Sequence, residues 1–144
     1  MGLLADFFAA TPKDASQYGS FVQNGTPIPT DRFQIASYTN FTPDALGMLW
    51  AVLRHEKWNV RRHQLEHVSH TEGGGTTWLF RFPEELVHRL AALSDADLHR
   101  VANKWVNPEV PGNADELLPV LRDLKRLAIQ AETHGTNLYL WGSL

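Results

Sequence analysis

The sequence predicts an α+β fold, with a small, mostly antiparallel sheet of about five short strands packed by four or five helices. Two observations indicate this class. Short stretches rich in aromatic and β-branched residues lie at both ends of the chain and in its middle, as strands require. Between them, apolar residues recur at helical spacing behind helix-start residues. The 144 residues contain no internal repeat and no linker-like tract, so we expect a single globular domain over 1–144.

The first part of the chain predicts two strands and a helical turn. Residues 2–8 are apolar and aromatic and predict a buried strand, and residues 11–15 supply the Thr and Pro of a helix start. Asp6 interrupts the apolar stretch, so we expect it at an edge or hydrogen-bonded, because a carboxylate is costly to bury unpaired. Residues 19–30 gather Gly, Asn and Pro and predict a loop, whereas residues 31–38 alternate like a half-buried strand.

The middle of the chain predicts a helix followed by a hairpin. Residues 41–56 place Thr42 as a cap before a proline, and leucines then follow at helical spacing. Residues 58–70 and 76–82 flank a glycine-rich turn, and the second arm is rich in β-branched and aromatic residues. A β-hairpin explains this arrangement best.

The last third predicts three helices and a closing strand. Residues 83–93 and 94–105 each begin with helix-start residues and predict two short helices. Residues 113–135 carry a long apolar stripe and end at a glycine, which predicts the longest helix. Pro119 lies within this stretch, so the helix either starts near it or is kinked there. Residues 137–144 are apolar and predict a strand, placed beside the N-terminal one.

Composition excludes several function classes. The formal charge is −3, and Lys and Arg are scattered rather than gathered in a basic stripe, so we expect no nucleic-acid partner. The absence of cysteine excludes disulfides, cysteine zinc sites, iron–sulfur clusters and thiol nucleophiles, and we expect no cofactor. No apolar stretch is long enough to span a membrane, and no basic residue precedes the apolar start, so we expect a cytoplasmic protein without membrane partners.

Several stretches resemble known catalytic motifs, but each lacks a residue that the motif requires. Residues 55–59 begin like the HExxH zinc-protease helix, but Asn59 stands where the second histidine ligand belongs. The glycines at 73–75 lack the lysine of a phosphate-binding Walker loop, and neither Gly-Ser pair forms the elbow of a serine hydrolase. No nucleophile can be assigned, which favours a protein that is not an enzyme.

Three histidines at positions 63, 67 and 70 are the candidate metal ligands. On a helix His63, His67 and His70 would share one face, but on a strand only His63 and His67 would do so. Glu66 or Glu72 would complete such a site. Two interpretations stay open, a metal-binding domain or small metal-dependent enzyme that uses this cluster, and a polar edge of the hairpin.

Five tryptophans are the sequence's main sign of a binding surface. Trp50 and Trp105 lie on apolar helical faces and are expected in the core. Trp58, Trp78 and Trp141 lie near element ends or on strands, which allows partial exposure, and the alternative is that all five tryptophans fill one core. Because tryptophan is enriched among the residues that contribute most to protein interfaces, these three are the candidate partner-binding residues.

Three segments carry a resemblance to known proteins. "ADFFAATPKDA", "GGGTTWLFRFPEELVHRLAAL" and the ending "NLYLWGSL" resemble a family of small uncharacterised bacterial proteins of similar length. In size, acidity and lack of a catalytic signature the chain is also similar in general character to bacterial immunity proteins, which neutralise a toxin by binding it. That likeness implies a protein partner, and the mild acidity would suit a basic toxin. A homo-oligomer formed through the apolar terminal strands is compatible with either function.

Overall fold

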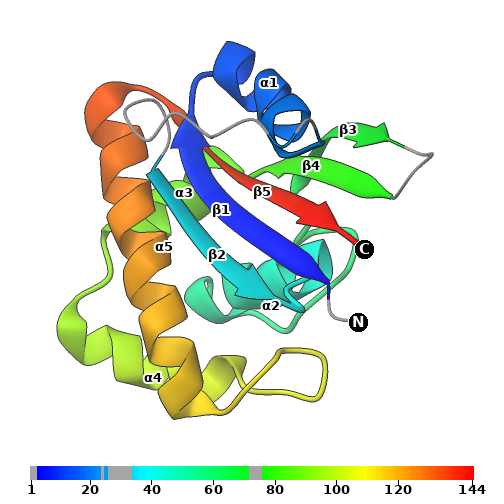
Figure 1. Cartoon of the computed structure of the whole chain (residues 1–144). Helices are drawn as coiled ribbons and strands as arrows, with labels where there is room; N and C mark the ends of the chain where they lie inside the picture. The colour runs from blue at the N-terminus through cyan, green and yellow to red at the C-terminus, as the bar shows by residue number, and fades with distance from the viewer. Residues whose placement is uncertain (1–2, 24, 26–33, 72–75) are drawn as a thin grey trace.

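The computed structural model describes residues 3–23, 25, 34–71 and 76–144. Its strands form a single antiparallel sheet in the order β2-β1-β5-β4-β3, which Figure 1 shows side by side. With the helices described below, this sheet confirms the α+β class. The strands are β1 (Leu4–Ala10), β2 (Gln34–Thr39), β3 (Glu66–Thr71), β4 (Thr77–Arg81) and β5 (Asn137–Ser143).

The helices divide between the two faces of the sheet. One packs on the face that carries Phe8 and Tyr139, and the other four build the larger core on the opposite face (Figure 1). In the described part of the chain no helix combines the length and apolar character that crossing a membrane requires. The helices are α1 (Pro12–Gln23), packed alone on its face, and α2 (Pro43–Leu53), α3 (Glu84–Ala91), α4 (Asp95–Trp105) and α5 (Ala114–His134).

Alternation along the central strands creates the two cores. Successive strand side chains point to opposite faces, so Phe7 and Leu140 join the larger core while Phe8 and Tyr139 face α1. The ring of Phe8 stacks on Tyr18 of α1, with centroids 4.3 Å apart, and on Tyr139, at 5.5 Å. Both strands are apolar on both faces because helices cover both faces.

The terminal strands β1 and β5 pair with each other in the middle of the sheet, from Leu4 opposite Ser143 to Ala10 opposite Asn137. The predicted pairing of the two chain ends is therefore confirmed. β1 also pairs with β2, and β5 with β4. Because both edges of β1 and β5 are occupied, these strands offer no free edge for the strand-to-strand dimer considered from the sequence.

Asp6 is hydrogen-bonded, which is one of the two alternatives expected from the sequence. The hydroxyl of Tyr18 donates to its Oδ2 at 2.6 Å. Burial raises the pKa of Tyr18 far above its ordinary value, and the hydrogen bond to Asp6 adds to the increase. The contact ties α1 to β1 through a neutral phenol and a carboxylate.

Helix ends agree closely with the start signals in the sequence. Thr42 Oγ1 accepts the N–H of Ala45 at 3.1 Å, and Asn113 forms a reciprocal capping box with Glu116 at the start of α5. α5 therefore starts well before Pro119, and the alternative start near that residue is wrong. Pro119 lies in the second turn on the exposed side, where water can bind the carbonyl that loses its helical donor.

Candidate functional site

The candidate site is built on residues 54–65, which connect α2 to β3 and which we call the Trp58 loop. It starts with a Schellman motif, in which His55 takes a left-handed φ of 57° and the N–H of Glu56 donates to the carbonyl of Ala51 at 2.9 Å. The N–H groups of Arg62 and His63 then close turns onto the carbonyl of Asn59. The predicted hairpin arm over 58–70 is thus wrong for 58–65, because this part satisfies its own backbone groups in turns, and β3 begins only at residue 66.

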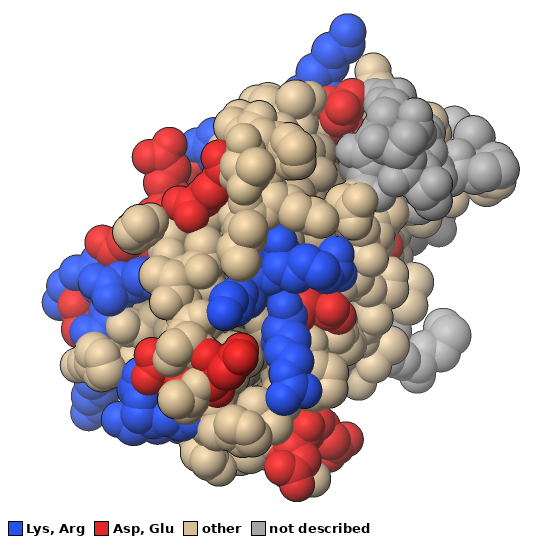
Figure 2. Space-filling model, turned by 90° about the vertical axis from the view of Figure 1, so that its left-hand side faces the viewer, with Lys and Arg blue, Asp and Glu red and all other residues tan. Residues whose placement is uncertain are grey.

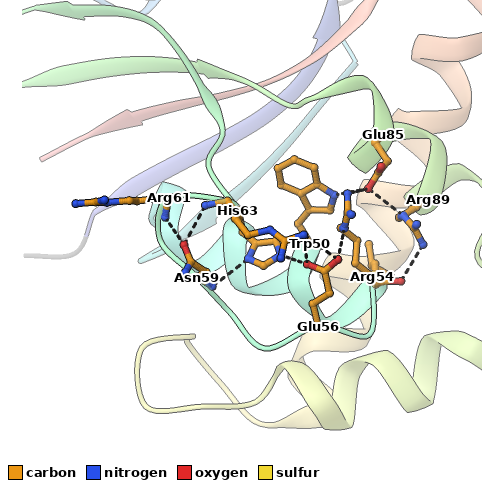
Figure 3. Close-up of polar contacts among 10 residues, drawn as sticks. Trp50, Arg54, Glu56, Asn59, Arg61, His63, Glu85 and Arg89 are labelled. Carbon is orange, nitrogen blue, oxygen red and sulfur yellow. Dashed lines mark hydrogen bonds and ion pairs between the residues drawn. The ribbon is translucent and has the colours of Figure 1, made fainter.

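His63 fixes the Trp58 loop from inside. Its side chain is buried, with 2% exposed. Its Nδ1 accepts the backbone N–H of Asn59 at 3.0 Å, so this nitrogen carries no proton. The ring proton is therefore on Nε2, which donates to Oε2 of Glu56 at 3.0 Å (Figure 3). A neutral imidazole with both nitrogens engaged joins the two ends of the loop.

Glu56 contacts two arginines and His63 within the loop. Its carboxylate accepts from Nε of Arg54 at 2.9 Å and lies 3.3 Å from the guanidinium of Arg62. The hydrogen bond from Arg54 lowers the pKa of Glu56 below its ordinary value, against an opposing effect of burial. The hydrogen bond from His63 and the charges of both arginines lower it further. The carboxylate is thus held in its charged form.

A second carboxylate ties the end of α2 to α3. Oε1 of Glu85 accepts from Arg54 at 2.6 Å, from Nε1 of Trp50 at 3.1 Å and from Arg89 at 3.2 Å (Figure 3). Arg89 also donates to the carbonyl of Leu53 at 3.1 Å, at the negative end of the α2 dipole. The start of the Trp58 loop is therefore anchored to two helices.

The outer part of the Trp58 loop is exposed over six consecutive residues. The Oδ1 of Asn59 accepts the N–H groups of Arg61 and Arg62, so side-chain and backbone bonds together set its shape. Trp58 is 36% exposed and Val60 is 48% exposed. The exposed run contains three cations and no carboxylate, and it consists of Lys57, Trp58, Asn59, Val60, Arg61 and Arg62.

The Trp58 loop lines two surface depressions. Trp58 and Glu56 help to line one of about 440 Å³, which also has apolar walls from Met48, Val52 and Pro108. The other has a volume of about 800 Å³. Among its lining residues are Arg61, Arg62 and Leu65 from the loop, Trp50 from α2, His67 from β3 and Phe80 from β4.

The structure does not bring the predicted metal ligands onto one strand face. His63 precedes β3 and is buried, whereas His67 is exposed on β3 with its ring edge-on to Phe80, 5.3 Å between centroids. The side chain of His70 lies outside the described part of the structure, as does Glu72, and Glu66 pairs with Arg81. Among the described residues, no group of three histidine or acidic side chains is placed to hold a metal ion. The prediction that His63 and His67 share a strand face is wrong.

The three candidate tryptophans do not form one surface. Trp141 is 4% exposed and packs edge-on against Tyr18 of α1, so its expected exposure is not observed. Trp78 is half-buried and lies over Gly142 on the neighbouring strand, where an added Cβ would be 2.3 Å from its Nε1. Trp58 remains as the exposed member. Trp105 is fully buried and donates to the carbonyl of Ala45 at 2.9 Å, as the core prediction requires.

Three residues that organise the site were not recognised in the sequence. Glu56 and Asn59 belong to the stretch that resembles an incomplete zinc-protease motif, and His63 was considered as a metal ligand or as part of a polar hairpin edge, but not as a buried residue. One signal could have identified their setting. Residues 55–64 lack the apolar alternation that a strand shows, which favours a loop.

Comparisons with known proteins assign no activity to this chain. Neither a protein-family model nor a curated protein matches the sequence. Among solved structures, the chain is similar to "The Crystal Structure of a Protein of Unknown Function YfbM from Escherichia coli", with 12% sequence identity and a TM-score of 0.40. The alignment covers 98% of this chain and 99% of that chain. The general likeness to immunity proteins gains no support from this neighbour.

Proposed function

We propose that this protein is a non-enzymatic protein-binding module that contacts its partner through the Trp58 loop. The observation that carries the proposal is an exposed tryptophan on a loop whose backbone is held by the buried, doubly hydrogen-bonded His63. Tryptophan and arginine are enriched among the residues that dominate binding energy, and here Trp58 is followed closely by Arg61 and Arg62.

Preorganisation of the loop supports this role. An exposed segment that is mobile when free loses conformational entropy on binding, which weakens association. The Trp58 loop instead has its turns fixed by Asn59 and His63, and its start is bonded to α3 through Arg54 and Glu85. A partner therefore meets a surface that is already shaped.

The depression beside Trp58 supplies the apolar part of the contact. Its apolar walls include Met48, Val52 and Pro108, and its volume of about 440 Å³ accommodates a large side chain. Val60, on the same loop, is a second exposed apolar side chain. An exposed aromatic side chain beside an apolar recess, with arginines on the same loop, contains residue types that are enriched in binding hot spots.

As the specific class of partner we propose a bacterial toxin, which this protein would neutralise by direct binding. This proposal follows from the small size and the missing catalytic signature of the chain, and no residue identifies a particular toxin. The chemistry at His63 agrees with a role without catalysis, because the Nδ1 that would act as a base already accepts a backbone N–H.

The experiment is affinity capture of the tagged protein in lysate of its native host, with mass spectrometry of what is retained. We expect one partner at near-equal amount, and we expect Trp58→Ala to weaken its binding about 30-fold, as for a hot-spot residue. The matched control is Ile129→Ala on α5, which removes a similarly exposed apolar side chain (43%) and should leave binding unchanged. Equal retention by the two variants, or no stoichiometric partner, would show that the proposal is wrong. If the partner is a toxin, co-expression will restore growth with wild type but not with Trp58→Ala.

A further inference from the structure

We infer that the partner contributes an acidic segment, with carboxylates that meet Arg61 and Arg62 and a large apolar side chain in the wider depression. This inference rests on the proposed function, since it specifies the partner of the same loop. Its first support is local charge. Residues 57–62 hold three cations and no acid, although the whole chain has a formal charge of −3.

The cations of the loop are only partly neutralised within the chain. The nearest carboxylate to Arg62 is Glu56, at 3.3 Å, but this group also accepts from Arg54 and His63. In the described part of the structure, neither Lys57 nor Arg61 takes part in an ion pair. Figure 3 shows Arg61 extending away from the other labelled side chains. Its guanidinium is available for a carboxylate outside the chain.

Arg126 on α5 contrasts with Arg61. On the side of the molecule where α5 lies, Figure 2 shows Lys and Arg atoms interspersed with Asp and Glu atoms. Arg126 on that helix, for example, lies 3.4 Å from Asp123. Arg126 is thus paired on its own helix, whereas Arg61, which lines the wider depression, takes part in no ion pair with the residues that the structure describes.

The wider depression determines the rest of the ligand. Its lining combines Arg61 and Arg62 with apolar side chains, among them Leu65 and Phe80, within about 800 Å³. Of the two acids that also line it, Glu66 is bonded to Arg81. Asp44 lies in the first turn of α2, where the helix dipole stabilises it. The site therefore fits a peptide segment in which acidic residues flank an aromatic or large aliphatic one.

Local rather than total charge decides which partner surface is favourable. Charges further apart than roughly 8 Å are largely screened at physiological ionic strength, so the charges that matter at the contact are the three cations of residues 57–62 and the nearby acids. Of these acids, Glu56 and Glu66 already pair with arginines of this chain. The mild acidity of the whole chain suggested a basic partner, but a basic surface facing the Trp58 loop would meet like charges.

The test uses three labelled synthetic peptides, Glu-Glu-Phe-Glu-Glu and its versions with lysine or glutamine in place of glutamate. Fluorescence anisotropy measures their affinity, and NMR of the full chain locates the contact. We expect the glutamate peptide to bind most tightly and to shift the signals of Arg61, Arg62 and the Trp50 indole. The double variant Arg61→Gln/Arg62→Gln should weaken its binding about tenfold, and high salt should act in the same direction. The control Arg122→Gln/Arg126→Gln removes equal charge from α5 and should bind like wild type.

Several results would overturn the inference. They are equal or tighter binding of the lysine or glutamine peptide, no binding of the glutamate peptide, an unaffected arginine double variant, or stronger binding of a single-stranded DNA oligonucleotide. The two proposals can fail separately. If capture of the cellular partner depends on Trp58 but not on the two arginines, the proposed function stands and the acidic partner is wrong. If the peptide binds through the two arginines but capture of the cellular partner does not depend on Trp58, the acidic ligand stands and the proposed function is wrong.

Discussion

Replacing Gly47 by alanine tests whether the Trp58 loop is held in one position. Gly47 lies inside α2, where alanine normally stabilises a helix by roughly 0.5–1 kcal/mol relative to glycine. Here an added Cβ would lie 2.1 Å from the backbone carbonyl oxygen of His63 and 3.4 Å from Nε1 of Trp58. The contact with a backbone atom cannot be relieved by rotating a side chain, so we expect the sign of the effect to reverse.

The size of the effect follows from what must move. To reach an ordinary contact of 3.4 Å, the His63 carbonyl would have to retreat by more than 1 Å. Such a shift strains the bonds of the His63 ring to Asn59 and to Glu56, which are 3.0 Å each. Losing a neutral hydrogen bond costs about 1 kcal/mol and one to a charged group about 1.5–3 kcal/mol. After the gain in helix propensity, Gly47→Ala should lower the free energy of unfolding by about 2–3 kcal/mol, or the melting temperature by about 10 °C.

Urea denaturation followed by circular dichroism measures this change. The matched control is Gly19→Ala in α1, where the added Cβ would meet only Nε1 of Trp141, at an ordinary 3.4 Å. That substitution should raise the free energy of unfolding by about 0.5–1 kcal/mol. The two glycine substitutions should therefore have opposite signs. A Gly47→Ala protein as stable as wild type would refute the fixed packing of the loop on α2.

Two further predictions concern the ends of the same loop. His55 has a left-handed φ of 57° in the Schellman motif, so His55→Gly should raise the free energy of unfolding by about 1 kcal/mol in urea denaturation, and a loss of stability would contradict that backbone geometry. The pKa of Glu56 is below its ordinary 4.5 in the folded protein, so its contribution to stability is present above pH 4.5 and is lost as the pH falls through the folded pKa. Glu56→Gln should be less stable than wild type at neutral pH and should lose less stability below pH 4.5, and parallel pH profiles of the two proteins would count against this role.

Most of the fold could be predicted because its signals are local. The cap at Thr42, the capping box at Asn113 and the apolar stripe of α5 each depend on residues a few positions apart. The apolar chain ends were sufficient to predict that β1 and β5 pair, because such strands need cover on both faces. The predicted start of β3 was wrong because residues 58–65 satisfy their backbone groups within the loop instead of in a ladder. Their lack of apolar alternation was the one local signal of this loop.

The candidate site was only partly accessible from sequence. Trp58 was among the predicted partner-binding residues, but so was Trp141, which is buried. The two differ in what covers them. Tyr18 of α1, more than a hundred positions away, packs against Trp141, whereas Trp58 lies on a loop with one side open to solvent. The residues next to a tryptophan in the sequence do not show whether a helix from a distant part of the chain will bury it.

The sequence alone determined the class of fold, the helix starts and the absence of cysteine chemistry, since each depends on neighbouring residues or on composition. Only the tertiary structure decided that His63 is buried, with both ring nitrogens hydrogen-bonded. Glu56 and Asn59 are hydrogen-bonded to the His63 ring, and Gly47 leaves room for the His63 backbone because it has no side chain. These residues come together only when α2 and the loop pack against each other. Burial and hydrogen-bond partners are properties of a packed chain, so a residue's chemistry is settled only where its neighbours in space are known.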